Sequence, residues 1–237
     1  MLIDLYTLRA RVFPVYLATA PALLAVAAAL PTGANVPLTG LSAVVLLPLA
    51  YLFGQIAADR GKRIEPRLWR SWGGVPTVRY LRHDNDEFNA GTRLRVHTAL
   101  QSLGLAIPTA AEERADQQRA VKLYEAAVEE LRRLTRDAKR FPLVREANIE
   151  YGFRRNLLGL KGVGLFVTVS SALVIGYILW TEWNAQRSLA PVPLVCGLLC
   201  LTVLLAWVLG VRGDAVRLPA ERYARFLLEA SLGLAAS

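Results

Sequence analysis

The chain has 237 residues, 54% of them hydrophobic, and its 28 Lys and Arg outnumber its 19 Asp and Glu. The 47 residues Val12–Ala58 contain no charge, and between Lys161 and Arg212 the only charged residues are Glu182 and Arg187. About a quarter of the residues in soluble domains are charged, so this pattern excludes a soluble enzyme, and the apolar content excludes a disordered chain. We therefore predict an integral membrane protein with a charged middle segment.

The first uncharged block is long enough for two membrane-crossing helices, each of which needs about 20 apolar residues. We predict one span over Phe13–Leu30 and a second over Leu41–Ala57, joined by the turn-forming segment Pro31–Pro37. A cleaved signal peptide is the alternative for the first span. The second uncharged stretch, which follows directly, argues against cleavage.

The second uncharged block repeats this plan, with predicted spans over Val163–Trp180 and Leu194–Val211 and a loop over Thr181–Pro193. One face of the third span carries small and weakly polar residues, namely Gly164, Thr168, Ser171 and Ile175. Small residues allow two helices to approach closely, so a packing seam is one interpretation of this face. The alternative is a weakly polar pore lining in an oligomer.

The segment between the two blocks has helical rather than strand patterning. Thr109 and Glu112 have the spacing of a capping box, which predicts a long helix to about Lys139 with a basic end. Further helices are predicted over residues 86–103 and from Pro142 toward the third span. The fold class is all-α, with two membrane hairpins and a central helical domain.

A distinctive segment lies between the second span and this domain. Two tryptophans, a Gly-Gly pair and a proline fall within nine residues there and predict a tight structural turn: Trp69, Trp72, Gly73, Gly74 and Pro76.

Residues 59–161 hold 21 basic and 14 acidic residues, which suggests an anionic ligand. Arginine binds phosphate through its forked guanidinium group. The candidate ligands for an oligonucleotide or phosphate are Arg79, Arg82, Arg93, Arg95, Arg136, Arg140, Arg154 and Arg155. Attraction to anionic lipid headgroups would also account for the charge, and the sequence leaves both open.

Chemical signatures of an enzyme are missing from the sequence. His83 and His97 are the only histidines, which is too few for a histidine-rich metal site, and neither a phosphate-binding loop nor a nucleophile elbow occurs. We expect no catalytic residues, no metal and no cofactor.

Lys and Arg collect on one side of the predicted spans, and such residues mark the cytoplasmic side. We expect a multi-pass inner-membrane protein with both termini cytoplasmic. Its predicted parts are the N-terminal tail and first hairpin (1–58), a cytosolic domain (59–161), the second hairpin (162–211) and a tail (212–237). From residue 218 the tail is an amphipathic helix that docks on the cytosolic domain or lies on the bilayer.

Residues 60–161 contain four distinctive motifs: Leu68-Trp69-x-x-Trp72-Gly73-Gly74-x-Pro76-Thr77, Leu81-Arg82-His83, Pro108-Thr109-x-x-Glu112 and Tyr151-Gly152-Phe153-Arg154-Arg155-Asn156-Leu157-x-Gly159-Leu160. Together they resemble a family of small prokaryotic four-span membrane proteins, similar to the membrane effector of Hailong anti-phage systems. The resemblance implies an oligomeric channel whose opening harms the infected cell, restrained by a DNA oligomer from a partner nucleotidyltransferase.

Two functional hypotheses follow. The first is a ligand-gated membrane effector, a homo-oligomeric ion channel or pore, in which the helix carrying Arg154 and Arg155 transmits ligand binding to the third span. The second is a non-catalytic scaffold whose basic surface recruits anionic lipid or an acidic partner.

Overall fold

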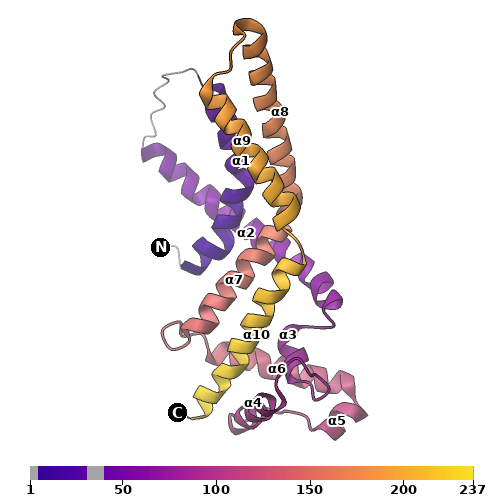
Figure 1. Ribbon diagram of the computed structural model, residues 1–237. Coiled ribbons are helices and arrows are strands. Elements are labelled where there is room, and N and C mark those ends of the chain that lie inside the picture. The colour runs from indigo at the N-terminus through magenta and orange to yellow at the C-terminus, as the bar shows by residue number, and fades with distance from the viewer. Residues whose placement is uncertain (1–4, 31–39, 237) are drawn as a thin grey trace. The chain divides into compact units, whose positions relative to one another are not determined.

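The computed structural model describes residues 5–30 and 40–236, with only the backbone for residues 40–48, and within these ranges the chain forms helices and no strand (Figure 1). The chain divides into two compact units. Unit 1 contains the residues up to Ile64 together with Gly152–Ala215, and unit 2 contains Glu65–Tyr151 together with the chain from Val216 onward. The two ends of segment 59–161 therefore belong to unit 1.

Unit 1 contains the apolar helices. Three of them are long and apolar enough to cross a membrane, which indicates a membrane protein: Thr7–Ala29, Lys161–Gln186 and Pro191–Gly210. Its elements are η1 (Thr7–Val12), α1 (Phe13–Ala29), the first part of α2 (Gly40–Ser71), the last part of α7 (Pro142–Gly159), α8 (Lys161–Gln186), α9 (Pro191–Leu205) and η2 (Ala206–Gly210). The predicted second span lies within α2, where side chains are described only from residue 49 onward, and the predicted turn Pro31–Pro37 lies outside the described residues.

Helices α1, α8 and α9 lie side by side (Figure 1). The predicted face of Gly164, Thr168, Ser171 and Ile175 is the buried face of α8. A Cβ atom on Gly164 would lie 2.3 Å from the Trp207 ring, so the glycine makes room for that ring. The Cys200 thiol also donates to the Thr168 carbonyl at 3.4 Å. This face therefore packs inside one chain.

Unit 2 contains an apolar core built mainly by α3, α4, α6 and α10. Its elements are the last part of α2, α3 (Pro76–Leu81), α4 (Ala90–Ser102), α5 (Ala110–Ala115), α6 (Gln117–Leu134), the first part of α7 and most of α10 (Asp214–Ala235). Tyr124 and Leu131 of α6 are fully buried in this core together with Leu227 and Leu228 of α10. The C-terminal helix thus docks on unit 2 through its apolar face.

The predicted long helix from Thr109 is two helices. The capping box is confirmed, because Thr109 Oγ1 accepts the Glu112 N–H and Glu112 accepts the Thr109 N–H. However, Asp116 has an extended backbone, and its carboxylate caps α6 by accepting the Arg119 N–H at 2.9 Å. A short acidic side chain that bonds the backbone ahead of it favours such a break. Helix α6 ends at Leu134 rather than near Lys139, and the helix predicted over 86–103 begins only at Ala90.

The predicted structural turn follows the end of α2. The Gly74 N–H bonds the Trp69 carbonyl at 2.8 Å and the Gly73 N–H bonds the Arg70 carbonyl at 3.4 Å, the pattern of a Schellman motif. Gly73 has φ +81° and Gly74 has φ +128°, conformations that favour glycine. Pro76 then occupies the start of α3, where its missing N–H costs nothing.

Candidate anion-binding surfaces

The eight arginines predicted to bind a ligand do not form one cluster. Six of them belong to unit 2, whereas Arg154 and Arg155 belong to unit 1. Their local partners show which of them remain available to a ligand.

Arg79 is a buried structural residue of α3, with 8% of its surface exposed. Its guanidinium donates to the Trp72 carbonyl, to Glu87 at 2.6 Å and to Glu221 at 2.8 Å. Arg217 also donates to Glu221 at 2.7 Å. Burial raises the pKa of Glu221, but the hydrogen bonds from Arg217 and Arg79 outweigh it and leave the pKa below its ordinary value. Arg79 therefore joins α3, the end of α2 and α10.

Arg82 belongs to a polar network around a buried carboxylate. It binds both oxygens of Asp84 at 2.9 and 2.6 Å and donates to Glu113 at 3.1 Å. Glu113 also accepts the His83 N–H and the Tyr124 hydroxyl, each at 3.0 Å. Burial is the largest cause of a strongly raised Tyr124 pKa, and the bond to Glu113 adds to it. Every oxygen of Glu113 is thus engaged within unit 2.

A cavity of about 270 Å³ adjoins this network and is lined by Arg82, His83, Asp84, Ala110, Glu113, Arg114 and Gln117. Its two arginines face two carboxylates, so the lining has no excess positive charge with which to attract an anion.

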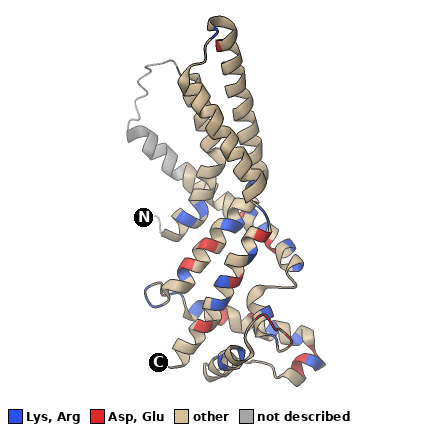
Figure 2. Cartoon of the chain, viewed as in Figure 1, with Lys and Arg blue, Asp and Glu red and all other residues tan. Residues whose placement is uncertain are grey.

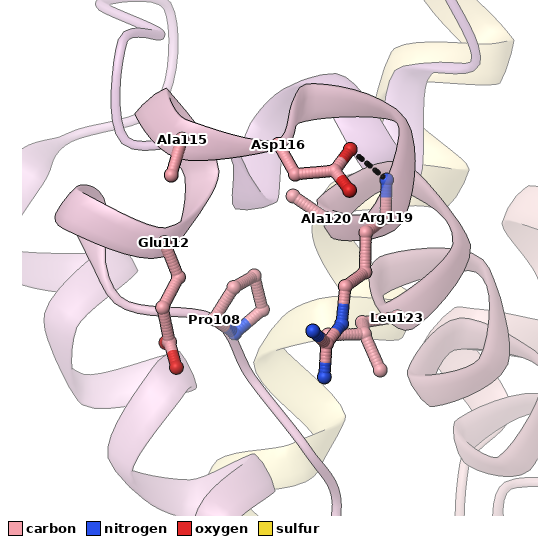
Figure 3. Close-up of a pocket in the computed structure, with 7 residues that line it drawn as sticks. All are labelled: Pro108, Glu112, Ala115, Asp116, Arg119, Ala120 and Leu123. Carbon is pink, nitrogen blue, oxygen red and sulfur yellow. Dashed lines mark hydrogen bonds between the residues drawn. The ribbon is translucent and has the colours of Figure 1, made fainter.

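A second cavity, of about 140 Å³, lies beside the α5–α6 junction (Figure 3). It is lined by Pro108, Glu112, Ala115, Asp116, Arg119, Ala120 and Leu123. Its carboxylates already cap helices, and hydrogen bonds from Thr109 lower the pKa of Glu112. Across the described ranges, no group of three or more His, Cys, Asp or Glu could hold a metal ion.

The other predicted arginines divide between structural and exposed positions. Arg93 donates to the Asn85 and Phe88 carbonyls and closes the loop before α4. Arg155 is buried and donates to Asn156 Oδ1 at 3.1 Å. Arg95 and Arg154 are exposed.

The densest exposed positive charge of unit 2 follows helix α6. We call residues 132–145 the α6–α7 corner; Asp137 is the single acid among the basic residues Arg132, Arg133, Arg136, Lys139, Arg140 and Arg145. Arg133 pairs with Glu130, and Arg140 lies over the Phe141 ring at 5.5 Å. The exposed side chains of Arg132, Arg136 and Lys139 have no ion pair within the described part of the chain. The sequence prediction included Arg136 and Arg140 as ligand residues, and it matched the basic helix end, which also holds Arg132, Arg133 and Lys139, to the negative end of the helix dipole.

A second basic surface lies in unit 1. We call its charged residues the basic collar; they are Arg9, Arg11, Arg60, Lys62, Arg63, Arg154, Arg155, Lys161 and Arg212, with the acids Asp59 and Asp214. They flank the apolar helices at one end, where Figure 2 shows blue residues gathered.

Contacts within unit 1 bring the chain segments of the collar together. Lys161 Nζ donates to the Val211 carbonyl at 2.7 Å, and Arg11 donates to Gln55 at 3.0 Å. The Asn156 amide donates to the Ala10 carbonyl at 2.7 Å. Helix η1, the middle of α2, the end of α7, the start of α8 and the residue after η2 therefore meet at this end of the apolar helices.

The division into two units shows where the excess positive charge of segment 59–161 lies. Residues 65–151 hold 15 basic and 13 acidic residues, against 21 and 14 for the whole segment. Most of the excess charge thus belongs to the collar and not to unit 2.

Comparisons with protein-family models, with curated proteins and with solved structures find no match to this chain.

Proposed function

We propose that the protein is a ligand-gated membrane effector, in which a homo-oligomer forms an ion channel and unit 2 binds a nucleotide or oligonucleotide. The observation that carries the proposal is the α6–α7 corner, whose exposed Arg132, Arg136 and Lys139 have no ion pair among the described residues, in the same chain as three helices able to cross a membrane. The resemblance to Hailong effectors supports an anti-phage role and a DNA-oligomer signal from a partner nucleotidyltransferase.

The corner is a better ligand site than the original set of eight arginines. Arg79, Arg82 and Arg93 already bind carboxylates or carbonyls of unit 2, so a ligand would have to replace those partners. Arg132 lies in the last turn of α6 and Arg136 follows the helix end at Leu134, and like charges this close in the chain repel each other. A phosphate-bearing ligand would offset this repulsion and gain charge-assisted hydrogen bonds.

Four membrane crossings fit the contacts of unit 1. The chain leaves the collar at Arg11 and returns to it at Gln55, because these two side chains are hydrogen-bonded. From Arg11 the helix continues to Ala29, which is about 27 Å at 1.5 Å per residue. A second crossing in the first part of α2 would bring the chain back to the collar, which supports four spans.

The orientation follows from the same surface. An excess of Lys and Arg marks the cytoplasmic side of bacterial inner-membrane proteins. With four crossings, both termini and unit 2 lie on the side of the collar, which we assign to the cytoplasm.

Helix α7 supplies a route for gating. It begins at Pro142 inside the α6–α7 corner and ends at Gly159, one residue before α8 begins. Leu160 separates the two helices with φ −92° and ψ −2°, so the backbone changes direction without losing the bond from the Gly164 N–H to the Leu160 carbonyl. A ligand that repositions the first turn of α7 would act on α8 through this single residue.

Ligand binding is tested with purified full-length protein and a fluorescent oligothymidylate, measured by anisotropy across a salt series. The triple variant R132Q/R136Q/K139Q should bind at least about tenfold more weakly, and the slope of log affinity against log salt should fall by about 2. The matched control, R60Q/K62Q/R63Q, removes equal charge from the collar and should bind normally. Equal binding by both variants would reject the corner as the site, and absence of binding by the wild type would reject the ligand class.

Channel activity is tested by ion flux from liposomes containing the protein. Addition or removal of bound oligonucleotide should change the flux, and R132Q/R136Q/K139Q should remove that response.

A scaffold remains the second candidate function, because the charges of unit 2 are nearly balanced and three predicted ligand arginines hold its own structure. A scaffold would show no ion flux with or without oligonucleotide.

A further inference from the structure

The basic collar has an inner and an outer layer. The inner cations hold the unit together, since Lys161 bonds the Val211 carbonyl, Arg11 bonds Gln55 and Arg155 bonds Asn156. The outer cations are exposed and have no side-chain partner within the described residues. They are Arg60, Lys62, Arg63, Arg154 and Arg212.

The outer layer lies next to an apolar surface of membrane dimensions. Phe13, Tyr16 and Leu17 at the start of α1 are each at least 45% exposed, although they are apolar or aromatic. The helix Thr7–Ala29 covers about 35 Å, slightly more than the hydrocarbon core of about 30 Å. The bond from Asn156 to Ala10 and the close approach of Gly159 to Gly61 place the segments that carry Arg154 and Arg60–Arg63 beside the start of this helix, at the depth of the lipid headgroups.

The two ends of the apolar helices differ in charge. At the far end, the described charged residues are only Glu182 in the last turns of α8 and Arg187 directly after α8, whereas the collar has nine basic residues and two acids. Exposure to water alone would not require more cations at one end of the helices than at the other. An anionic membrane surface on the collar side accounts for this difference in charge.

We infer that the outer layer of the collar binds the phosphates of anionic phospholipids. The cations come from three separate chain segments, at residues 60–63, 154 and 212, so they suit several small ligands better than one compact molecule. Separate lipid headgroups meet this requirement, and guanidinium groups bind phosphate oxygens in pairs. Each basic residue near an anionic membrane surface contributes about 1 kcal/mol.

Lipid binding at the collar is distinct from nucleotide binding, because it uses no residue of the α6–α7 corner. The collar would instead hold the membrane helices at a fixed depth and favour membranes rich in acidic lipid.

The test uses full-length protein in detergent, with phosphatidylglycerol or phosphatidylcholine added, and native mass spectrometry to count retained lipids. The wild type should retain phosphatidylglycerol preferentially, and R60Q/K62Q/R63Q should reduce this preference by about 100-fold. The matched control R132Q/R136Q/K139Q removes the same charge from unit 2 and should keep the preference. Inorganic phosphate at millimolar concentration should not displace the bound phosphatidylglycerol. A site for free phosphate would instead release the lipid when inorganic phosphate is added.

Two outcomes would overturn the inference: equal retention of both lipids by the wild type, or an unchanged preference in R60Q/K62Q/R63Q. If that variant does not fold, a salt series with the wild type tests the inference instead. High salt should abolish the preference for phosphatidylglycerol and leave retention of phosphatidylcholine unaffected.

Discussion

The two units use arginine in opposite ways. In unit 2, Arg79 and Arg93 point into the protein and hold loops and helices together, whereas in unit 1 Arg60 and Arg63 point outward beside apolar helices. A count of positive charges would not distinguish these two groups of arginines. The hydrogen-bond and ion-pair partners of each side chain show whether it stabilises the fold or is available to a ligand or a membrane.

Removal of Arg79 should produce the largest effect on stability. It tests whether unit 2 depends on its internal cations. Arg79→Met removes a donor from Glu87, Glu221 and the Trp72 carbonyl, although Arg217 still bonds Glu221, and breaking a buried pair costs about 3–5 kcal/mol. Pulse proteolysis of unit 2 across a urea series measures the loss. The exposed Arg95→Gln should stay within about 0.5 kcal/mol of the wild type, and equal stability of the two variants would contradict the structural role of Arg79.

A glycine variant tests the close packing beneath the collar in unit 1. A Cβ atom on Gly159 would lie 2.7 Å from the Gly61 nitrogen and 2.8 Å from the Arg60 carbonyl carbon. These are backbone atoms, so Gly159→Ala must separate two helices and should cost about 1–3 kcal/mol. Thermal unfolding in detergent measures the effect. Gly162→Ala is the control, because no heavy atom lies within 4 Å of its added Cβ; a similar loss there would show that helix contact is not the cause.

Asp116 tests whether the acids of unit 2 serve local structure. Asp116→Ala removes the cap of α6 and should lower the free energy of unfolding by about 1 kcal/mol, as measured by urea denaturation. Asp116→Asn keeps a capping oxygen without the charge and should be nearly neutral. If Asn destabilises as much as Ala, the charge and not the hydrogen bond is what matters.

The smallest expected effect is a pH dependence of unit 2. Burial lowers the pKa of His97 below its ordinary value of 6.5, and the hydrogen bond to the Leu81 carbonyl only partly opposes this. Below about pH 6.5 the unfolded chain therefore binds a proton that the folded chain excludes. The free energy of unfolding should have its full value above this pH and should decrease as the pH falls below it. The charged and titratable groups around His97 are His83, Arg93, Glu113 and Tyr124.

Unfolding free energies at about pH 5.5 and pH 7.5, on either side of the ordinary histidine pKa, measure this dependence, and His97→Gln should flatten it. A slope that persists in His97→Gln would assign the proton to another group.

Local signals made part of the fold predictable. The capping box at Thr109 and the glycine turn at Gly73 depend on residues within about six positions, and both occur as expected. The face of α8 that carries Thr168 was recognised from its spacing, although the choice between packing and pore lining needed the neighbouring helices.

Long-range partners made the rest unpredictable. Arg79 meets Glu221 across 142 positions in the chain, and no local pattern marks that pair. The same holds for the collar, whose segments become one surface only through contacts such as that of Lys161 with Val211. The break at Asp116 was detectable in principle, since Asp is a frequent helix cap, but the preceding capping box favoured a single continuous helix.

The bond between Asn156 and Ala10 has a consequence for how the chain can vary. Pro14 has no N–H to offer the Ala10 carbonyl four residues earlier, and the fully buried Asn156 amide supplies that donor from 146 positions away. Proline and asparagine therefore form a compensating pair. Asn156→Leu should be harmful beside Pro14 and less harmful in a chain that also carries Pro14→Ala, which makes the two positions candidates for correlated change in related sequences.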